Sequence, residues 1–223
     1  MPDRAAIRDY ARELTLVETD DISNTKINNI IDQGIRELAS RFRWPWLETT
    51  DTIAVVAGTR SYALPTDFQY LHSLLRAGSK IRLRATSPSK ALGTYGDDFP
   101  EGTAEGYYLW GSSLFLTRNP ASNETLNLFY YQSPTMLSND TDVPGFDAQF
   151  HLLLADYAIS KIWEREEDFV KAKASENRWD DGIEQMARWY QERTEDMPMV
   201  LGEEPTIRAT VLNMPWLSDA GIL

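Results

Sequence analysis

Residues 27–56 read INNIIDQGIRELASRFRWPWLETTDTIAVV, and the spacing of apolar side chains changes within this stretch. In its first half the apolar side chains recur every three or four residues, which predicts a helix with one buried face that ends before Pro45. After Glu48 polar and apolar residues alternate and β-branched residues become frequent, which predicts a strand. The chain therefore changes from helix to sheet close to residue 46.

Helical spacing also occurs on both sides of this stretch. Residues 3–16 are expected to form a helix whose buried stripe is Ala6, Ile7, Tyr10, Ala11 and Leu14. Helical spacing returns at residues 150–162 and 169–190, with an acidic turn at 164–168 between them.

Between these helices the alternating pattern predicts several short strands. The expected strands are residues 50–56, 61–64, 68–75, 80–85, 106–110, 113–117 and 125–131. Gly111 and Ser112 separate two apolar runs, which is typical of a two-residue hairpin turn of the primed type. Residues 87–95 are expected to form one or two helical turns between strands.

These elements together predict an α+β fold. In this fold a helical bundle is formed by N- and C-terminal helices, with an inserted antiparallel β domain and an extended C-terminal arm. The expected segments are residues 1–46 for the N-terminal helices, 47–146 for the β domain, 147–199 for the C-terminal helices and 200–223 for the arm. Trp44, Pro45 and Trp46 are expected at the domain junction, where wide flat side chains can cover both cores.

The charge is strongly acidic. The chain has 22 Lys+Arg against 34 Asp+Glu, a formal net charge of −12, which argues against ordinary sequence-reading DNA binding. Residues 147–204 contain 15 acids and 7 bases, so a net −8 of the total lies there. DNA that must pass the protein without adhering to it is compatible with this charge.

No residue pattern points to catalysis, to a cofactor or to a metal. There is no cysteine, and neither a phosphate-binding glycine motif nor a nucleophile elbow occurs. His72 and His151 lie far apart in apolar stretches and are expected to be structural histidines. No stretch approaches the about 18 consecutive apolar residues that span a bilayer, so we expect no membrane partner. We therefore predict a cytosolic, non-enzymatic protein.

The last stretch, residues 205–223, is unusually apolar for a free tail. Arg208 and Asp219 cancel in charge, and Pro205 and Pro215 interrupt any helix. The bulky apolar residues of this segment are Ile207, Val211, Leu212, Met214, Trp216, Leu217, Ile222 and Leu223. We expect them to form an extended arm that becomes ordered against another chain.

An alternative function rests on aromatic residues of the strands. The run comprises Tyr107, Tyr108, Trp110, Phe115, Phe129, Tyr130 and Tyr131. Aromatic side chains with polar tips occur at recognition sites, so this run could form a carbohydrate-binding platform or another recognition surface. Because neighbouring residues of a strand point to opposite faces, about half of these rings are expected in the core instead.

Three stretches carry a resemblance to a known family. They are residues 28–39 (NNIIDQGIRELA), 41–48 (RFRWPWLE) and 55–68 (VVAGTRSYALPTDF). These stretches resemble the head-to-tail adaptor (connector) proteins of tailed bacteriophages. The resemblance extends to the distal helix pair and to Arg188-Trp189-Tyr190.

The resemblance implies a viral structural protein without enzymatic activity. Such adaptors form a homo-oligomeric ring, usually dodecameric, that docks under the portal protein at the capsid vertex and presents a surface to the tail or nozzle protein. Their C-terminal arm inserts into the portal, and residues 205–223 match that arm in position and character. The implied location is the head-tail interface of the virion, after synthesis in the bacterial host cytoplasm. DNA would pass through the ring channel during ejection without specific binding.

Overall fold

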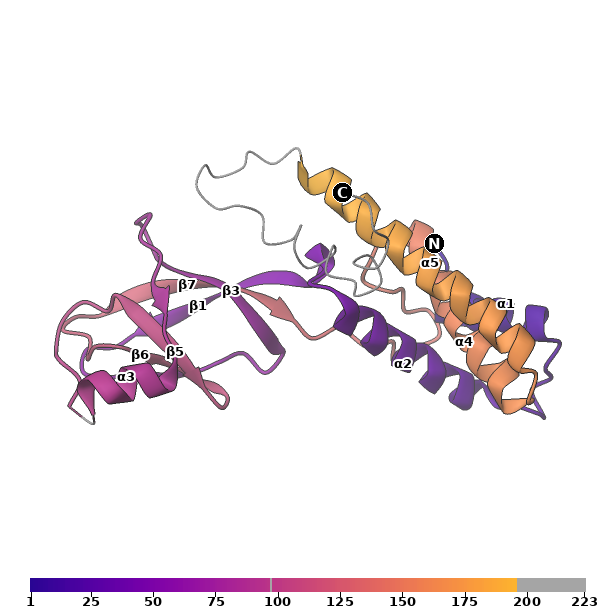
Figure 1. Cartoon of the computed structure of the whole chain (residues 1–223), viewed down its shortest axis with the longest axis horizontal. Coiled ribbons are helices and arrows are strands. Elements are labelled where there is room, and N and C mark those ends of the chain that lie inside the picture. The colour runs from indigo at the N-terminus through magenta and orange to yellow at the C-terminus, as the bar shows by residue number, and fades with distance from the viewer. Residues whose placement is uncertain (97, 196–223) are drawn as a thin grey trace, which may run out of the picture. The chain divides into compact units, whose positions relative to one another are not determined.

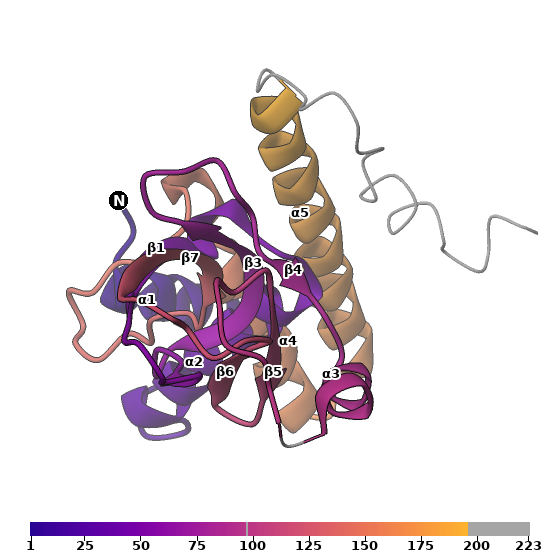
Figure 2. The same ribbon diagram turned by 90° about the vertical axis from the view of Figure 1, so that its left-hand side faces the viewer.

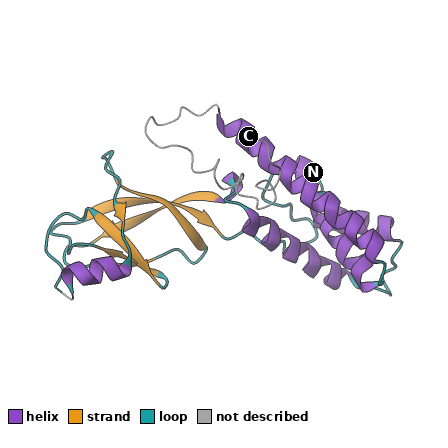
Figure 3. Cartoon of the chain, in the orientation of Figure 1, coloured by secondary structure: helices purple, strands orange, loops and turns teal. Residues whose placement is uncertain are grey.

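A computed structural model describes residues 1–96 and 98–195, and both helices and strands are present (Figures 1 and 3). The contacts divide the chain into two units, Met1–Ala187 and Arg188–Leu223. The first unit contains the strands and most of the helices, so the predicted α+β class is confirmed. The predicted boundaries at residues 46, 146 and 199 stay predictions.

Four long helices come from the two ends of the chain. They are α1 (Arg4–Thr15), α2 (Asn24–Arg41), α4 (Leu153–Arg165) and α5 (Phe169–Glu195), the last of which continues into the second unit. Helix α4 packs against both α1 and α2. The rings of Tyr157 on α4 and Trp179 on α5 have centroids 5.1 Å apart, which joins α5 to this bundle. None of the described helices is long and apolar enough to cross a membrane.

Two glycines allow the helices to approach closely. A Cβ placed on Gly34 of α2 would lie 2.9 Å from Cδ1 of Tyr157 on α4. A Cβ placed on Gly182 of α5 would collide with Leu153 of α4. The apolar spacing predicted the buried face of α2. The close contacts with α4 are possible only because glycine has no side chain at these two positions.

The predicted buried stripe of α1 was wrong in part. Ile7 and Ala11 are buried, but Ala6 is exposed, and Tyr10 and Leu14 are 39% and 47% exposed. The helix is rotated from the expected orientation, and its buried face includes Arg4 and Arg8.

The arginines of α1 face polar residues of α2 that accept hydrogen bonds from them, and Arg8 also donates to both carboxylate oxygens of Asp140, at 2.7 and 3.1 Å. Three pairs form a ladder, with donor–acceptor distances of 3.0, 3.3 and 2.8 Å: Arg4 with Asp32, Arg8 with Asn28, and Arg12 with Asn24. Members of the ladder are four residues apart on each helix, so they share one face, and their order shows that the two helices are antiparallel.

The strands form two sheets. One sheet has the order β1-β7-β3, with β1 (Glu48–Val55), β7 (Glu124–Gln132) and β3 (Phe68–Arg76). The other has the order β2-β6-β5-β4, with β2 (Ser61–Ala63), β6 (Ser113–Leu116), β5 (Gly106–Trp110) and β4 (Arg84–Ala85). Helix α3 (Pro88–Tyr95) lies between β4 and β5 in sequence.

The strand pairings are antiparallel with one exception. Strand β4 pairs with β5 in parallel, with Arg84 opposite Gly106. Only the end of the expected strand 80–85 forms a strand, β4. Its first part makes a single isolated bridge to β3, between Arg82 and Leu75. The β5–β6 hairpin turns at Gly111, whose φ of +58° is a conformation that glycine adopts without strain.

The two sheets of the strand region share one core, and their strands are labelled in Figure 2. Both sheets contribute to one buried cluster, which consists of Ile53, Val55, Leu74, Leu83, Ala104, Tyr107, Leu114, Leu116, Leu126, Leu128 and Tyr130. The inward side chains therefore belong to a sandwich-like arrangement rather than to an exposed binding face.

Candidate functional site: the helix-to-sheet junction and the docking surfaces

The predicted partner-binding arm lies outside the described residues, which end at Glu195. This applies to Ile207, Val211, Leu212, Met214, Trp216, Leu217, Ile222 and Leu223. The arm therefore stays a prediction.

Trp44 closes the end of α2. Its side chain is 1% exposed, and its indole Nε1 donates a 2.6 Å hydrogen bond to the carbonyl oxygen of Leu38. The last four carbonyls of a helix lack intrahelical partners, and Leu38 is among them. Phe42 packs edge-on against Trp44, with ring centroids 5.2 Å apart. Trp44 thus belongs to the helical core.

Beyond Trp44 the chain turns through the short 3-10 helix η1 (Pro45–Leu47) into β1. Trp46 is half-buried, and its ring centroid lies 5.5 Å from that of Phe146, on the segment that returns from β7 to the helices. Trp44 and Trp46 therefore lie on either side of Pro45 and contact different segments. The junction therefore contains two segments: the one that leads from α2 into β1, and the one that leads from β7 back to the helices.

Two buried tyrosines of β7 anchor the strands beside this junction. The hydroxyl of Tyr130 donates to Asp67 at 3.0 Å, and that of Tyr131 donates to Glu48 at 3.1 Å. Burial, with the neighbouring carboxylates, raises the pKa of each tyrosine to about 12. Both hydroxyls are thus held neutral, as hydrogen-bond donors, at physiological pH.

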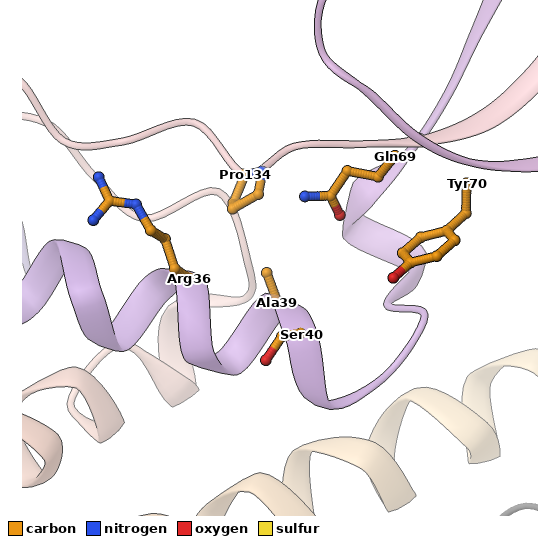
Figure 4. A pocket seen from close by; sticks show the side chains of 6 residues that line it. All are labelled: Arg36, Ala39, Ser40, Gln69, Tyr70 and Pro134. Atoms are coloured by element: carbon orange, nitrogen blue, oxygen red, sulfur yellow. The ribbon is translucent and has the colours of Figure 1, made fainter. Parts of the chain in front are cut away.

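A shallow pocket of about 410 Å³ lies between α2 and β3 (Figure 4). It is lined by Arg36, Ala39, Ser40, Gln69, Tyr70 and Pro134. Tyr70 is 56% exposed, and the guanidinium of Arg43 lies over its ring at 5.6 Å. The lining contains no carboxylate and no histidine.

The two histidines differ in their surroundings. His151 is 1% exposed, with Nδ1 3.0 Å from the carbonyl oxygen of Pro2 and Nε2 2.8 Å from that of Phe146, as a structural histidine requires. His72 is exposed, so the expectation of apolar surroundings was wrong. The register of β3 shifts between Leu71 and Ser73, and this irregularity interrupts the alternation on which the expectation depended.

Among the residues that the structure describes, no group of three or more His, Asp or Glu side chains is placed to hold a metal ion.

The aromatic run does not form a platform. Tyr107, Tyr108, Tyr130 and Tyr131 are all buried, and Phe115 and Phe129 are half-buried. Trp110 is the member of the run that is exposed, at 63%. A single exposed ring beside a hairpin turn gives little support to the carbohydrate-binding alternative.

Sequence reasoning missed a basic surface on the strand region. Residues 68–96 contain five bases and no acid, in a chain with 34 acids. Four of these bases are exposed, and no carboxylate of the described residues forms an ion pair with them: Lys80, Arg82, Arg84 and Lys90. This acid-free run was visible in the sequence, but the acidic net charge of the whole chain drew attention away from it.

Sequence reasoning also missed exposed apolar residues at the turns of the helical bundle. Leu16 is 86% exposed, Phe169 68% and Val170 83%. The helical spacing predicted that the chain turns near these residues. It gave no sign that bulky apolar side chains would point to solvent there.

The sequence matches the family described as SU10 adaptor protein over residues 4–205. No curated protein matches the chain.

Proposed function

The chain belongs to the SU10 adaptor protein family, a family of phage head-tail adaptors, and from this premise we propose that its copies form a ring that docks on the portal protein. The family match over residues 4–205 carries the proposal. The chain is a structural adaptor of a phage virion. The proposed ring has twelve-fold symmetry, continues the DNA channel and presents a platform to the tail or nozzle protein.

The distribution of charge supports a channel through which DNA slides. The segment 147–204 has a net charge of −8, so it offers few free cations to displace the counterions of DNA. A wall formed by the helices of this segment would therefore bind passing DNA weakly.

The composition of the C-terminal segment supports its assignment to portal docking. The family match ends at residue 205, where this segment begins, so the assignment depends on the residues themselves. Burying about five of its large apolar side chains would contribute roughly 7–15 kcal/mol before the cost of ordering the segment. A substantial net affinity remains if about half of this is lost to ordering.

The test uses the full chain, purified portal rings of the same phage and a variant that lacks residues 205–223. Negative-stain electron microscopy should reveal a second ring on portals mixed with the full chain. The truncated variant should remain folded by circular dichroism and should leave the portals bare. Equal decoration by both forms would exclude the arm as the docking element.

Two single substitutions in the C-terminal segment separate the contribution of apolar burial to portal docking from that of charge. Trp216→Ala should weaken portal docking more than Arg208→Ala, because a large aromatic side chain commonly dominates the binding energy of such contacts. Titration of labelled portal with each variant measures the difference. A larger loss with Arg208→Ala would mean that charge, and not apolar burial, holds the arm.

A further inference from the structure

The turns between helices lie together at one end of the bundle. His151, just before α4, contacts Pro2, just before α1, so the two helices start at the same end and run in the same direction. The turn after α1 and the turn after α4 therefore share the opposite end, which Figure 1 also shows. We name this end, formed by residues 13–21 and 164–170, the helical end surface.

The helical end surface combines acidic charge with exposed apolar side chains. Its two segments contain eight acids and one base. Glu13, Asp20 and Glu167 are exposed, and none of them forms an ion pair with a base of the described residues. Leu14, Leu16, Phe169 and Val170 are the exposed apolar residues, at 47%, 86%, 68% and 83%. Monomeric proteins rarely leave this much bulky apolar surface in one place without a partner.

The strand region carries a surface of the opposite kind. The backbone N–H of Leu83 donates to Leu74 of β3, and the side chain of Leu83 points into the core. Because side chains alternate along an extended segment, Arg82 and Arg84 point outward on the other face. We name Lys80, Arg82 and Arg84, together with the exposed Lys90 of the following helix α3, the basic strip.

We propose that copies of this chain meet by placing the helical end surface of one copy on the basic strip of the next. The contact pairs the unmatched acids with the unmatched bases and covers the exposed apolar side chains of the helical end surface. It joins two different surfaces, and such a heterologous contact closes into a ring when its rotation permits. The inference rests on the proposed ring and names the surfaces that hold it.

A second copy fits the observations better than DNA does. Phosphates would satisfy the basic strip alone, because DNA interfaces are mainly polar and offer no partner to exposed apolar side chains. DNA would also leave the helical end surface exposed, whereas one contact between copies covers both surfaces.

The main competing explanation is protection of a sheet edge. Bases on an outer strand prevent unwanted pairing with other strands, and the basic strip could serve that purpose alone. Reversing the bases would then change solubility, but reversing acids on a different part of the molecule could not correct the change. Charge exchange between copies therefore separates the two explanations.

Two full-chain variants provide the test. The first carries Lys80→Glu, Arg84→Glu and Lys90→Glu, and leaves Arg82 intact because it donates a hydrogen bond to the carbonyl of His72. The second carries the reversals of the helical end surface: Glu13→Lys, Asp20→Lys and Glu167→Lys. A matched control carries Arg36→Glu, Arg43→Glu and Arg118→Glu, which lie outside both surfaces, so that it has the same net charge as the first variant.

Ring formation is followed by mass photometry and electron microscopy at about 0.15 M salt, with and without portal rings. Each variant alone should need at least about tenfold more protein than wild type to form rings, because like charges then face each other. The control should assemble as wild type does. An equimolar mixture of the two variants should restore rings with alternating copies, because every interface then pairs opposite charges.

Several results would overturn the inference. They are assembly of either variant alone at wild-type concentration, an equal defect in the control, and a mixture that remains unassembled. Absence of rings for the wild-type chain itself, even on portals, would instead refute the proposed function.

Discussion

Replacing Gly34 by alanine tests the packing of the helical bundle most directly. Gly34 lies in the middle of α2, and the added Cβ would lie 2.9 Å from Cδ1 and 3.2 Å from Cγ of Tyr157. The ring cannot easily retreat, because it is 3% exposed and its centroid is 5.1 Å from that of Trp179. The substitution therefore forces α2 and α4 apart.

Two effects of opposite sign set the magnitude. Alanine favours a helix over glycine by about 1 kcal/mol. Overpacking a well-filled core costs about 1–3 kcal/mol, and the rigid ring favours the upper half of that range. We expect a net destabilisation of about 1–2 kcal/mol, which lowers the melting temperature of a chain of this size by about 2–8 °C.

Thermal melting of the full chain by circular dichroism measures the effect. Gly93→Ala is the matched control, because Gly93 lies in α3 and a Cβ there would meet no atom within 4 Å. That substitution should stabilise the protein slightly through helix propensity alone. If Gly34→Ala stabilised the protein as much as Gly93→Ala does, the close contact between α2 and α4 would be refuted.

Three further predictions follow from the junction and the arginine ladder. Trp44→Ala should destabilise the protein by about 3–5 kcal/mol in urea denaturation, because a fully buried ring is lost; an unchanged midpoint would contradict its burial. The pKa of Tyr130 and Tyr131 is raised from 10.0 to about 12, so the stability that the two neutral hydroxyls contribute is complete below pH 10 and is lost as the pH rises from 10 to 12. Tyr130→Phe should make the free energy of unfolding depend less steeply on pH in this range. Arg4→Ala should destabilise by about 2–3 kcal/mol because Asp32 loses its partner, and adding Asp32→Ala should recover part of the loss; purely additive losses would argue against coupling.

Much of the fold could be predicted because local pattern and tertiary structure agree. The apolar spacing of Ile27, Ile31, Ile35 and Leu38 identified the buried face of α2, and all four are buried. The β5–β6 hairpin was equally predictable, since the glycine at its turn has the positive φ that the turn requires.

The errors arose where the partner of a segment, and not its own pattern, decides the structure. Residues 80–85 alternate as a strand does, but they pass from β3 to β5 and pair only briefly with each. Alternation indicates which side chains point outward. It does not indicate which strand lies alongside or in which direction that strand runs.

The orientation of helix α1 was also mispredicted, because it depends on polar partners on other segments. Its arginines and the polar residues of α2 repeat every four residues, so a ladder was visible in the sequence once the two helices were known to be antiparallel. Hydropathy places arginine on the solvent side, and only a facing acceptor on another segment reverses that preference. The orientation of α1 therefore could not be derived from α1 alone.

The net charge of −12 raises the question of how copies could associate at all. At physiological salt the screening length is about 8 Å, so charges far from a contact contribute little to the repulsion between two copies. The charges inside the contact then decide the sign of the interaction. An acidic chain that keeps an acid-free basic strip can associate with the acidic end of another copy, while its remaining surface resists other contacts. Raising the salt concentration should therefore weaken ring formation, although the chain as a whole is repulsive; stronger assembly at high salt would point to apolar contacts without charge pairing.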